Sequence, residues 1–202
     1  MKSKGLVIAL SVIGGILLVA VLTVMWGVGV YNRLVAMDEG VNGAWSQVQN
    51  QYQRRFDLIP NLVETVKGYA THEKETLENV VEARAKVGQM TISPEVLKNP
   101  QAFQMFEKAQ GDLTTALSRL MVVTENYPNL KANENFLQLQ AQLEGTENRI
   151  AVERKHFNEV VQGYNTAIKT IPTSLIAGFG GFVPKAYFQA QTGAEEAPKV
   201  KF

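Results

Sequence analysis

The chain has no cysteine, and its 202 residues include only two histidines. Without cysteine it can form neither a disulfide bond nor a thiolate-ligated metal site, although this absence names no cellular compartment. It also lacks an excess of charge of either sign, because 20 Lys and Arg are balanced by 19 Asp and Glu that are interspersed along the chain. There is no basic stripe to neutralise phosphates, so we expect no nucleic-acid partner.

Catalytic and cofactor motifs are missing as well. The sequence shows no Gly-rich phosphate loop, no paired-carboxylate site and no serine nucleophile framed by a base. Glu153-x-x-His156 has the spacing used in di-iron bundles, but such a site needs a second motif of this kind. The other histidine, His72, has Tyr69 three residues before it. We therefore predict a protein that is not an enzyme, with no catalytic residue, metal, cofactor or small-molecule substrate. A membrane-bound enzyme or metal-binding bundle that uses polar residues inside the helices is the alternative.

The longest apolar run lies at residues 6–30, where no side chain is charged. About 25 helical residues at ~1.5 Å each span roughly 37 Å, enough to cross the ~30 Å hydrocarbon layer of a bilayer. A cleaved secretory signal would have an apolar core of only ~7–15 residues. Trp26 and Tyr31 stand where an interfacial aromatic belt would lie. We predict that residues 1–30 are an uncleaved membrane anchor, which makes the lipid bilayer one partner.

Charged residues beside the anchor favour one orientation. Lys2 and Lys4 precede it, whereas Arg33 on the other side is followed by Asp38 and Glu39. Because basic residues tend to stay in the cytoplasm, we expect a single pass with the soluble domain outside the cytoplasm.

The rest of the chain repeats apolar residues at helical spacing. Alternating steps of three and four residues mark the seam of one predicted helix, at Phe103, Phe106, Gln110, Leu113, Leu117, Leu120, Thr124 and Tyr127. Similar stripes run over 34–56 and 62–87, and a fourth recurs at sevens over 136–171. No strand-like alternation interrupts them. We predict an all-α fold, in which the single N-terminal transmembrane helix is followed by an antiparallel four-helix bundle over residues 31–171.

Pro60 allows two interpretations of the first bundle helices. If Asp57 caps a new helix, Pro60 lies in its first turn, where the missing N–H is harmless. If the helix continues, Pro60 kinks it. We predict the break, because it gives helices of mostly comparable length at 32–56, 58–88, 101–126 and 131–170. An unbroken rod could not be covered along its length by its neighbours.

Several longer motifs resemble those of a known family. They are Tyr31-Asn32-x-Leu34-Val35, Arg54-Arg55-x-Asp57-Leu58-Ile59-Pro60-Asn61-Leu62-Val63, Tyr127-Pro128-x-Leu130-Lys131-Ala132, Glu147-Asn148-Arg149-Ile150 and Tyr164-Asn165. With them the chain resembles the LemA family of bacterial membrane proteins over nearly its whole length. The resemblance implies an N-terminal anchor in the bacterial cell (inner) membrane and an antiparallel four-helix bundle. It implies no biochemical activity.

Arg54, Arg55 and Asp57, beside Pro60, are the first candidate site. One interpretation is an anion or partner contact at a helix junction. The other, which we favour, is a tight inter-helix corner held by charge-assisted hydrogen bonds.

An aromatic residue followed by asparagine recurs at Tyr31-Asn32, Phe157-Asn158 and Tyr164-Asn165. We expect the aromatic rings to fill the core and the asparagines to cap or pair at its edge.

Residues 172–202 form an apolar tail with several Gly and Pro, and the tail has a polar end. It is too interrupted to continue a helix and too apolar for a free linker. It therefore lies on the surface of the bundle or docks to lipid headgroups or another protomer. The candidate membrane or protomer contacts are Phe179, Phe182, Tyr187 and Phe188. After Gln191 the chain is polar and is predicted to be mobile.

Together these features predict a membrane-anchored helical scaffold that forms a homo-oligomer or binds other membrane proteins. The prediction rests on the anchor, the regular seams and the apolar tail. If four helices alternate in direction from the membrane, the tail returns toward the bilayer.

Overall fold

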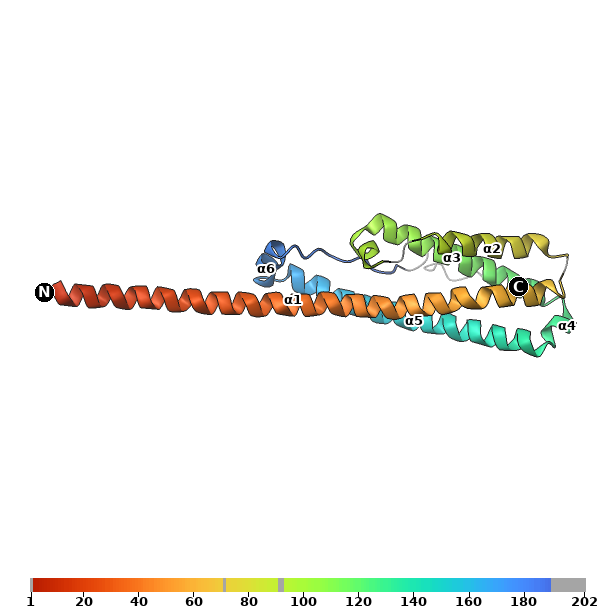
Figure 1. The fold of residues 1–202 in the computed structure, drawn as a ribbon, viewed down its shortest axis with the longest axis horizontal. Helices are drawn as coiled ribbons and strands as arrows, with labels where there is room; N and C mark the ends of the chain where they lie inside the picture. The colour runs from red at the N-terminus through yellow and green to blue at the C-terminus, as the bar shows by residue number, and fades with distance from the viewer. Residues whose placement is uncertain (1, 71, 91–92, 190–202) are drawn as a thin grey trace, which may run out of the picture.

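The computed structural model describes residues 2–70, 72–90 and 93–189, and every regular element within these ranges is a helix (Figure 1). The longest is α1, Lys2–Lys67, with 66 residues. The others are α2 (Lys74–Gly88), the 3-10 helix η1 (Pro94–Lys98), α3 (Pro100–Thr124), α4 (Pro128–Lys131), α5 (Glu134–Lys169) and α6 (Thr173–Phe179). The predicted all-α fold is therefore confirmed for the described residues.

Helix α1 continues through Pro60, so the predicted break beside Asp57 is wrong. The proline has no N–H and leaves the Phe56 carbonyl without its usual intrahelical donor. The Nε of Arg84, in α2, donates to this carbonyl at 3.2 Å. The guanidinium carbon of Arg84 also lies 3.7 Å from the centre of the Phe56 ring. Pro60 thus frees an acceptor through which α2 packs on α1.

The chain turns between Lys67 and Lys74, which is later than predicted. The helix predicted over 58–88 is therefore divided between the end of α1 and α2. Gly68 directly follows α1, and glycine has a low helix propensity. Helices of comparable length are not formed because the first part of α1 extends alone, without neighbours to cover it (Figure 1).

Asparagine side chains cap the N-termini of α3 and α5. Asn99 accepts hydrogen bonds from the backbone N–H groups of Gln101 and Ala102, each at 3.1 Å. Asn133 accepts one from Phe136 at 3.0 Å. These caps place α3 and α5 within a few residues of the helices predicted at 101–126 and 131–170.

Helix α1 packs mainly against α5, and α2 packs mainly against α3. In Figure 1 these four helices lie together in the right half of the view, while the first part of α1 extends alone to the left. We call the packed part the helical body. Its buried side chains form two apolar clusters. The first joins the end of α1 to α2, α3, α4 and the start of α5. The second joins the middle of α1, η1, the start of α3, the second half of α5 and α6.

The predicted seams form these clusters. Every seam residue from Phe103 to Thr124 is buried, including the polar Gln110. The apolar residues that recur every seven positions on α5 are buried from Phe136 to Tyr164. Its last member, Ile171, is 82% exposed because α5 ends at Lys169.

The first part of α1 carries exposed apolar side chains, and many of those between Leu6 and Val28 are more than half exposed. Among the described helices, α1 alone is long and apolar enough to cross a membrane, judged by length and composition. This agrees with the single N-terminal anchor predicted from the sequence.

Helix α5 leads back along α1 and brings α6 beside the end of this apolar part (Figure 1). The Ile176 side chain lies 3.6 Å from where a Cβ atom of Gly27 would be. The Phe182 ring meets the Tyr31 ring edge-on, with 5.5 Å between the centroids. The segment after α5 therefore lies beside residues 27–31 of α1.

Replacing Leu117 by alanine should leave a cavity in the first apolar cluster and lower the free energy of unfolding by about 2–5 kcal/mol. Val122→Ala in the same helix is the matched control, because Val122 is 70% exposed. It should change the free energy by less than about 0.5 kcal/mol. Denaturant unfolding of the purified protein measures both variants. Equal effects of the two substitutions would contradict the assignment of Leu117 to the buried seam of α3.

Candidate functional site

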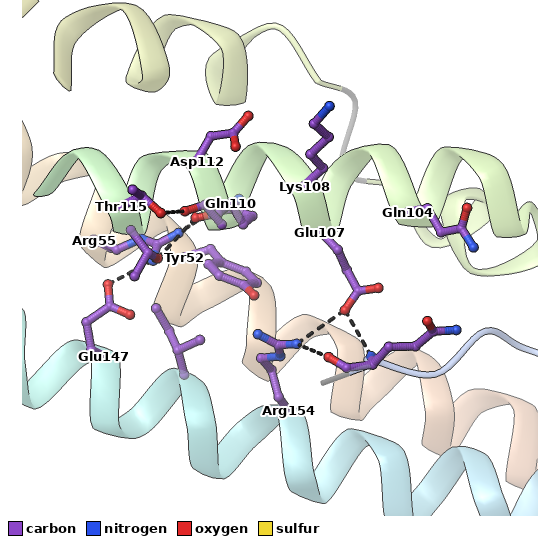
Figure 2. Close-up of a pocket in the computed structure, with 14 residues that line it drawn as sticks. Tyr52, Arg55, Gln104, Glu107, Lys108, Gln110, Asp112, Thr115, Glu147 and Arg154 are labelled. Carbon is purple, nitrogen blue, oxygen red and sulfur yellow. Dashed lines mark hydrogen bonds and ion pairs between the residues drawn. The ribbon is translucent and has the colours of Figure 1, made fainter. Parts of the chain in front are cut away.

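A polar pocket of about 530 Å³ lies between α1, α3 and α5 in the helical body (Figure 2). All three helices contribute charged or amide side chains to its lining, with Arg55 from α1, Glu107 and Gln110 from α3, and Glu147 and Arg154 from α5. The pocket therefore collects side chains of both charge signs where most of the body is apolar.

Arg55 lies in this pocket and is only 1% exposed. Its Nη1 donates to the Thr114 hydroxyl at 2.9 Å and to Glu147 Oε1 at 2.8 Å. Its Nη2 donates to Gln110 Oε1. One guanidinium thus connects α1 with both α3 and α5 (Figure 2). We call Arg55, Gln110, Thr114 and Glu147 the Arg55 layer.

The Arg55 layer is not fully paired. The Nε of Arg55 and the Nε2 of Gln110 are buried and have no hydrogen-bond partner in the described structure. Burying a charge costs several kcal/mol in desolvation, which a single carboxylate offsets only in part. We infer that the layer fixes the register of three helices more than it adds net stability.

The other two residues of the predicted corner lie elsewhere on α1. Arg54 and Asp57 are exposed, and Asp57 accepts a hydrogen bond from Gln53 in the same helix at 2.7 Å. The chain does not turn at Pro60, so the predicted inter-helix corner is wrong. Arg55 does join helices through charge-assisted hydrogen bonds, but it does so within the helical body and without Asp57.

Glu107 stands at the rim of the pocket and connects α3 with α5 and with the tail. Its Oε1 accepts hydrogen bonds from Arg154 Nη2 at 3.2 Å and from the backbone N–H of Gln189 at 3.0 Å. Burial raises the pKa of Glu107, while the Gln189 N–H and the Arg154 charge act in the opposite direction.

Residues 182–189, which we call the strap, run along α5 without regular secondary structure. Asn165 accepts a hydrogen bond from the Lys185 N–H and donates one to the Lys185 carbonyl, both at 2.9 Å. Asn158 makes the same pair of hydrogen bonds to Phe188, again at 2.9 Å. The expectation of paired asparagines is thus confirmed for Asn158 and Asn165, whose partner is the backbone of the tail. The Tyr31-Asn32 pair does not follow it, because Tyr31 is 44% exposed and Asn32 is exposed.

Lys185 of the strap is 4% exposed. Its Nζ lies 2.6 Å from Asp38 Oδ1 in α1 and 5.5 Å from the centre of the Tyr164 ring. The Tyr164 hydroxyl donates to the Val183 carbonyl at 3.1 Å. Burial and the nearby Asp38 carboxylate raise the pKa of Tyr164 to about 12.

The four aromatic residues predicted as outward contacts have different environments. Phe179 is 92% exposed and Tyr187 is 39% exposed. Phe182 is partly buried and packs against Tyr31. Phe188 is 6% exposed and packs against Trp45, Phe103 and Phe157, with 4.9–6.0 Å between ring centroids. Phe188 therefore fills the core and is not available as a surface contact.

The tail thus lies on the surface of the helical body along its described part, which was one of the two interpretations drawn from the sequence. Residues 190–202, whose polar part was predicted to be mobile, lie outside the described residues.

Metal-ligating side chains do not gather within residues 2–70, 72–90 and 93–189, where no group of three His, Asp or Glu could hold an ion. His156 of the Glu153-x-x-His156 motif is exposed, and so is His72. In the pocket Arg55 pairs with Glu147, and Glu107 pairs with Arg154 and with the strap, so these four charged groups connect elements of the body.

Comparison with protein families matches residues 44–202 to the model of the LemA family. The chain belongs to the LemA family. Three similar curated proteins are magnetosome protein MamQ of Magnetospirillum gryphiswaldense, magnetosome protein MamQ 2 of Paramagnetospirillum magneticum and protein LemA of Metamycoplasma hominis. The M. gryphiswaldense MamQ is 28% identical over 182 residues, and MamQ 2 is 27% identical over 181 residues. Each of these two matches covers 82% of this chain and 66% of the relative, so the chain spans slightly under two thirds of the MamQ length. The LemA protein is 26% identical over 166 residues, which cover 81% of this chain and 70% of the relative.

Local sequence patterns in this LemA-family chain indicate little of the Arg55 layer and of the strap contacts. Gln110 gave a signal, because it is a polar residue at a seam position. Glu147 stood in a motif used for the resemblance, but nothing in the sequence paired it with Arg55. The Lys185–Asp38 ion pair and the Glu107–Gln189 hydrogen bond join residues far apart in the chain, and no local pattern indicates them.

Arg55→Ala should lower the free energy of unfolding of this LemA-family protein by about 1–3 kcal/mol, because it leaves the buried Gln110 side chain without its partner, whereas Glu147, which is 37% exposed, can be solvated by water. Arg54→Ala is the matched control. It removes the same charge from an exposed position and should change the free energy by less than about 0.5 kcal/mol. Chemical unfolding followed by circular dichroism compares the two. If Arg55→Ala is as mild as Arg54→Ala, the layer does not join the helices.

Proposed function

We propose that this protein is a membrane-anchored helical scaffold that binds copies of itself or other membrane proteins, and that its body is an antiparallel four-helix bundle. The observation that carries the proposal is the continuity of α1. One helix of 66 residues contains both the exposed apolar stretch and the buried stripe of the helical body. A body joined to its anchor without a flexible link is held at a fixed height and direction, which suits a protein that positions partners at a membrane.

The exposed apolar side chains near α6 support a contact surface at the bilayer. Ile171 is 82% exposed, Leu175 63% and Phe179 92%. Helix α6, which carries Leu175 and Phe179, meets the end of the apolar part of α1 through Ile176 beside Gly27, and Phe182 meets Tyr31. Apolar side chains at this level can enter the headgroup region or meet the anchor of a neighbouring protein.

The family supports a non-catalytic role in a limited sense. The names of the relatives, magnetosome protein MamQ and protein LemA, state no reaction. The word magnetosome applies to the MamQ proteins. For this chain we propose only that it organises proteins at a membrane.

Crosslinking in living cells tests the scaffold. A membrane-permeant crosslinker should join the protein to a second copy or to another membrane protein, and Phe179→Glu should strongly reduce these products by placing a charge in the contact surface. Val122→Glu is the matched control, because it adds the same charge at an exposed apolar position on α3, 70% exposed. Failure to recover any membrane-protein product, or equal losses in both variants, would contradict the proposed contact surface.

We propose that the helical body lies outside the cytoplasm in the bacterial inner membrane, because Lys2 and Lys4 precede the apolar stretch. Protease added to intact spheroplasts should then digest the helical body, while a cytoplasmic marker protein stays whole. Protection of the body until the spheroplasts are lysed would reverse the assignment.

A further inference from the structure

The strap is bound by the helical body through its backbone and through two buried side chains. Asn165 and Asn158 bind the backbone of Lys185 and Phe188. The Ala186 N–H donates to the Leu97 carbonyl of η1 at 3.1 Å. Of the side chains in residues 184–188, only those of Lys185 and Phe188 are buried, the first against Asp38 and the second among aromatic rings. We call these contacts the strap groove.

The remaining positions of this five-residue segment are less restricted. Pro184 and Tyr187 are exposed, and Ala186 is half-buried. A ligand of the strap groove therefore needs a lysine and, three residues later, a phenylalanine. Hydrogen bonds to the backbone do not depend on side-chain identity, so the intervening residues can vary.

The chain contains this pattern a second time. Residues 184–188 read Pro-Lys-Ala-Tyr-Phe, and residues 198–202 read Pro-Lys-Val-Lys-Phe. Proline, lysine and phenylalanine recur at identical spacing. The two differences correspond to Ala186 and Tyr187, which are the half-buried and the exposed position of the strap. The second segment thus keeps both residues that the groove buries and differs only where the groove is permissive.

We propose that the strap groove is a binding site for the pattern Pro-Lys-x-x-Phe and that residues 198–202 of the same chain are its second ligand, in exchange with residues 184–188. In this second state Lys199 pairs with Asp38, and Phe202 enters the aromatic cluster around Trp45. Val200 and Lys201 take the places of Ala186 and Tyr187.

The exchange is a shift of the tail by 14 residues relative to the groove, from 184 to 198. Residues 182–197 then form a loop, and closing a loop of this size costs only about 2–3 kcal/mol because the cost grows slowly with length. Tethering keeps the second segment at an effective concentration in about the millimolar range. These two effects favour an exchange within one chain over capture of a segment from another copy.

Distances between spin labels in the full-length protein, reconstituted in nanodiscs, test this exchange. The chain has no cysteine, so single labels can be placed at will. Labels at exposed positions 64 and 187 give the reference distance for a docked segment. Labels at 64 and 201 should show a peak at the same distance, since Lys201 would occupy the place of Tyr187.

The same substitution in each motif should act in opposite directions. Lys199→Glu should reduce the docked peak of the 64/201 pair at least about tenfold, because it sets a like charge against the partly buried Asp38. Lys185→Glu should increase that peak, because it expels the competing segment. Circular dichroism checks that both variants keep their helices.

Three outcomes would overturn the proposal. If the labels at 64 and 201 do not show the reference distance, even in the Lys185→Glu variant, residues 198–202 do not bind the strap groove. Equal effects of Lys185→Glu and Lys199→Glu would mean that the lysines do not compete for Asp38. A docked peak that disappears on dilution with unlabelled protein would assign the bound segment to a second copy instead of the same chain.

Discussion

The uninterrupted helix α1 is the constraint on which the other features depend. Its first part has exposed apolar side chains, and its second part supplies buried residues to both apolar clusters. Pro60 would ordinarily end or kink such a helix. Here the carbonyl that it frees is taken by Arg84, so the disruption in α1 becomes an attachment point for α2. The orientation of α2 and the direction of the helical body relative to the apolar stretch follow from this one helix.

Polar side chains determine how the other elements are aligned on α1. Arg55 joins α1 to α3 and α5 within the helical body, and Asp38 holds the strap through Lys185. Asn158 and Asn165 then fix the strap along α5. Apolar packing tolerates small shifts of one helix against another, whereas these paired contacts are satisfied in one register. The body is therefore built from apolar clusters for stability and from a few buried polar contacts for alignment.

Much of the fold could be predicted from local patterns. The buried face of α3 was predictable from the seam between Phe103 and Thr124, and that of α5 from the apolar residues spaced seven apart between Phe136 and Tyr164. Asn99 and Asn133 cap these helices close to the predicted limits. The apolar run over residues 6–30 identified the exposed part of α1. The effect of Pro60 could not be predicted locally, because it depends on Arg84, which lies in another helix. The burial of Phe188, which is predicted as a surface contact, could not be predicted either, because it requires α1, α3 and α5 to meet. The candidate site was predictable only in part, since Arg55 was singled out while its partners are distant in sequence.

The continuity of α1 is tested most directly by the distance between two spin labels at exposed positions 33 and 64, on either side of Pro60, in the protein reconstituted in nanodiscs. An unbroken helix places these residues about 46 Å apart, because about 31 residues rise ~1.5 Å each. We expect a single narrow distribution near that value. A distribution centred below about 40 Å, the length of the ~27 residues from 33 to 60, or a broad distribution would show that the chain turns at Pro60 and that α1 is not continuous.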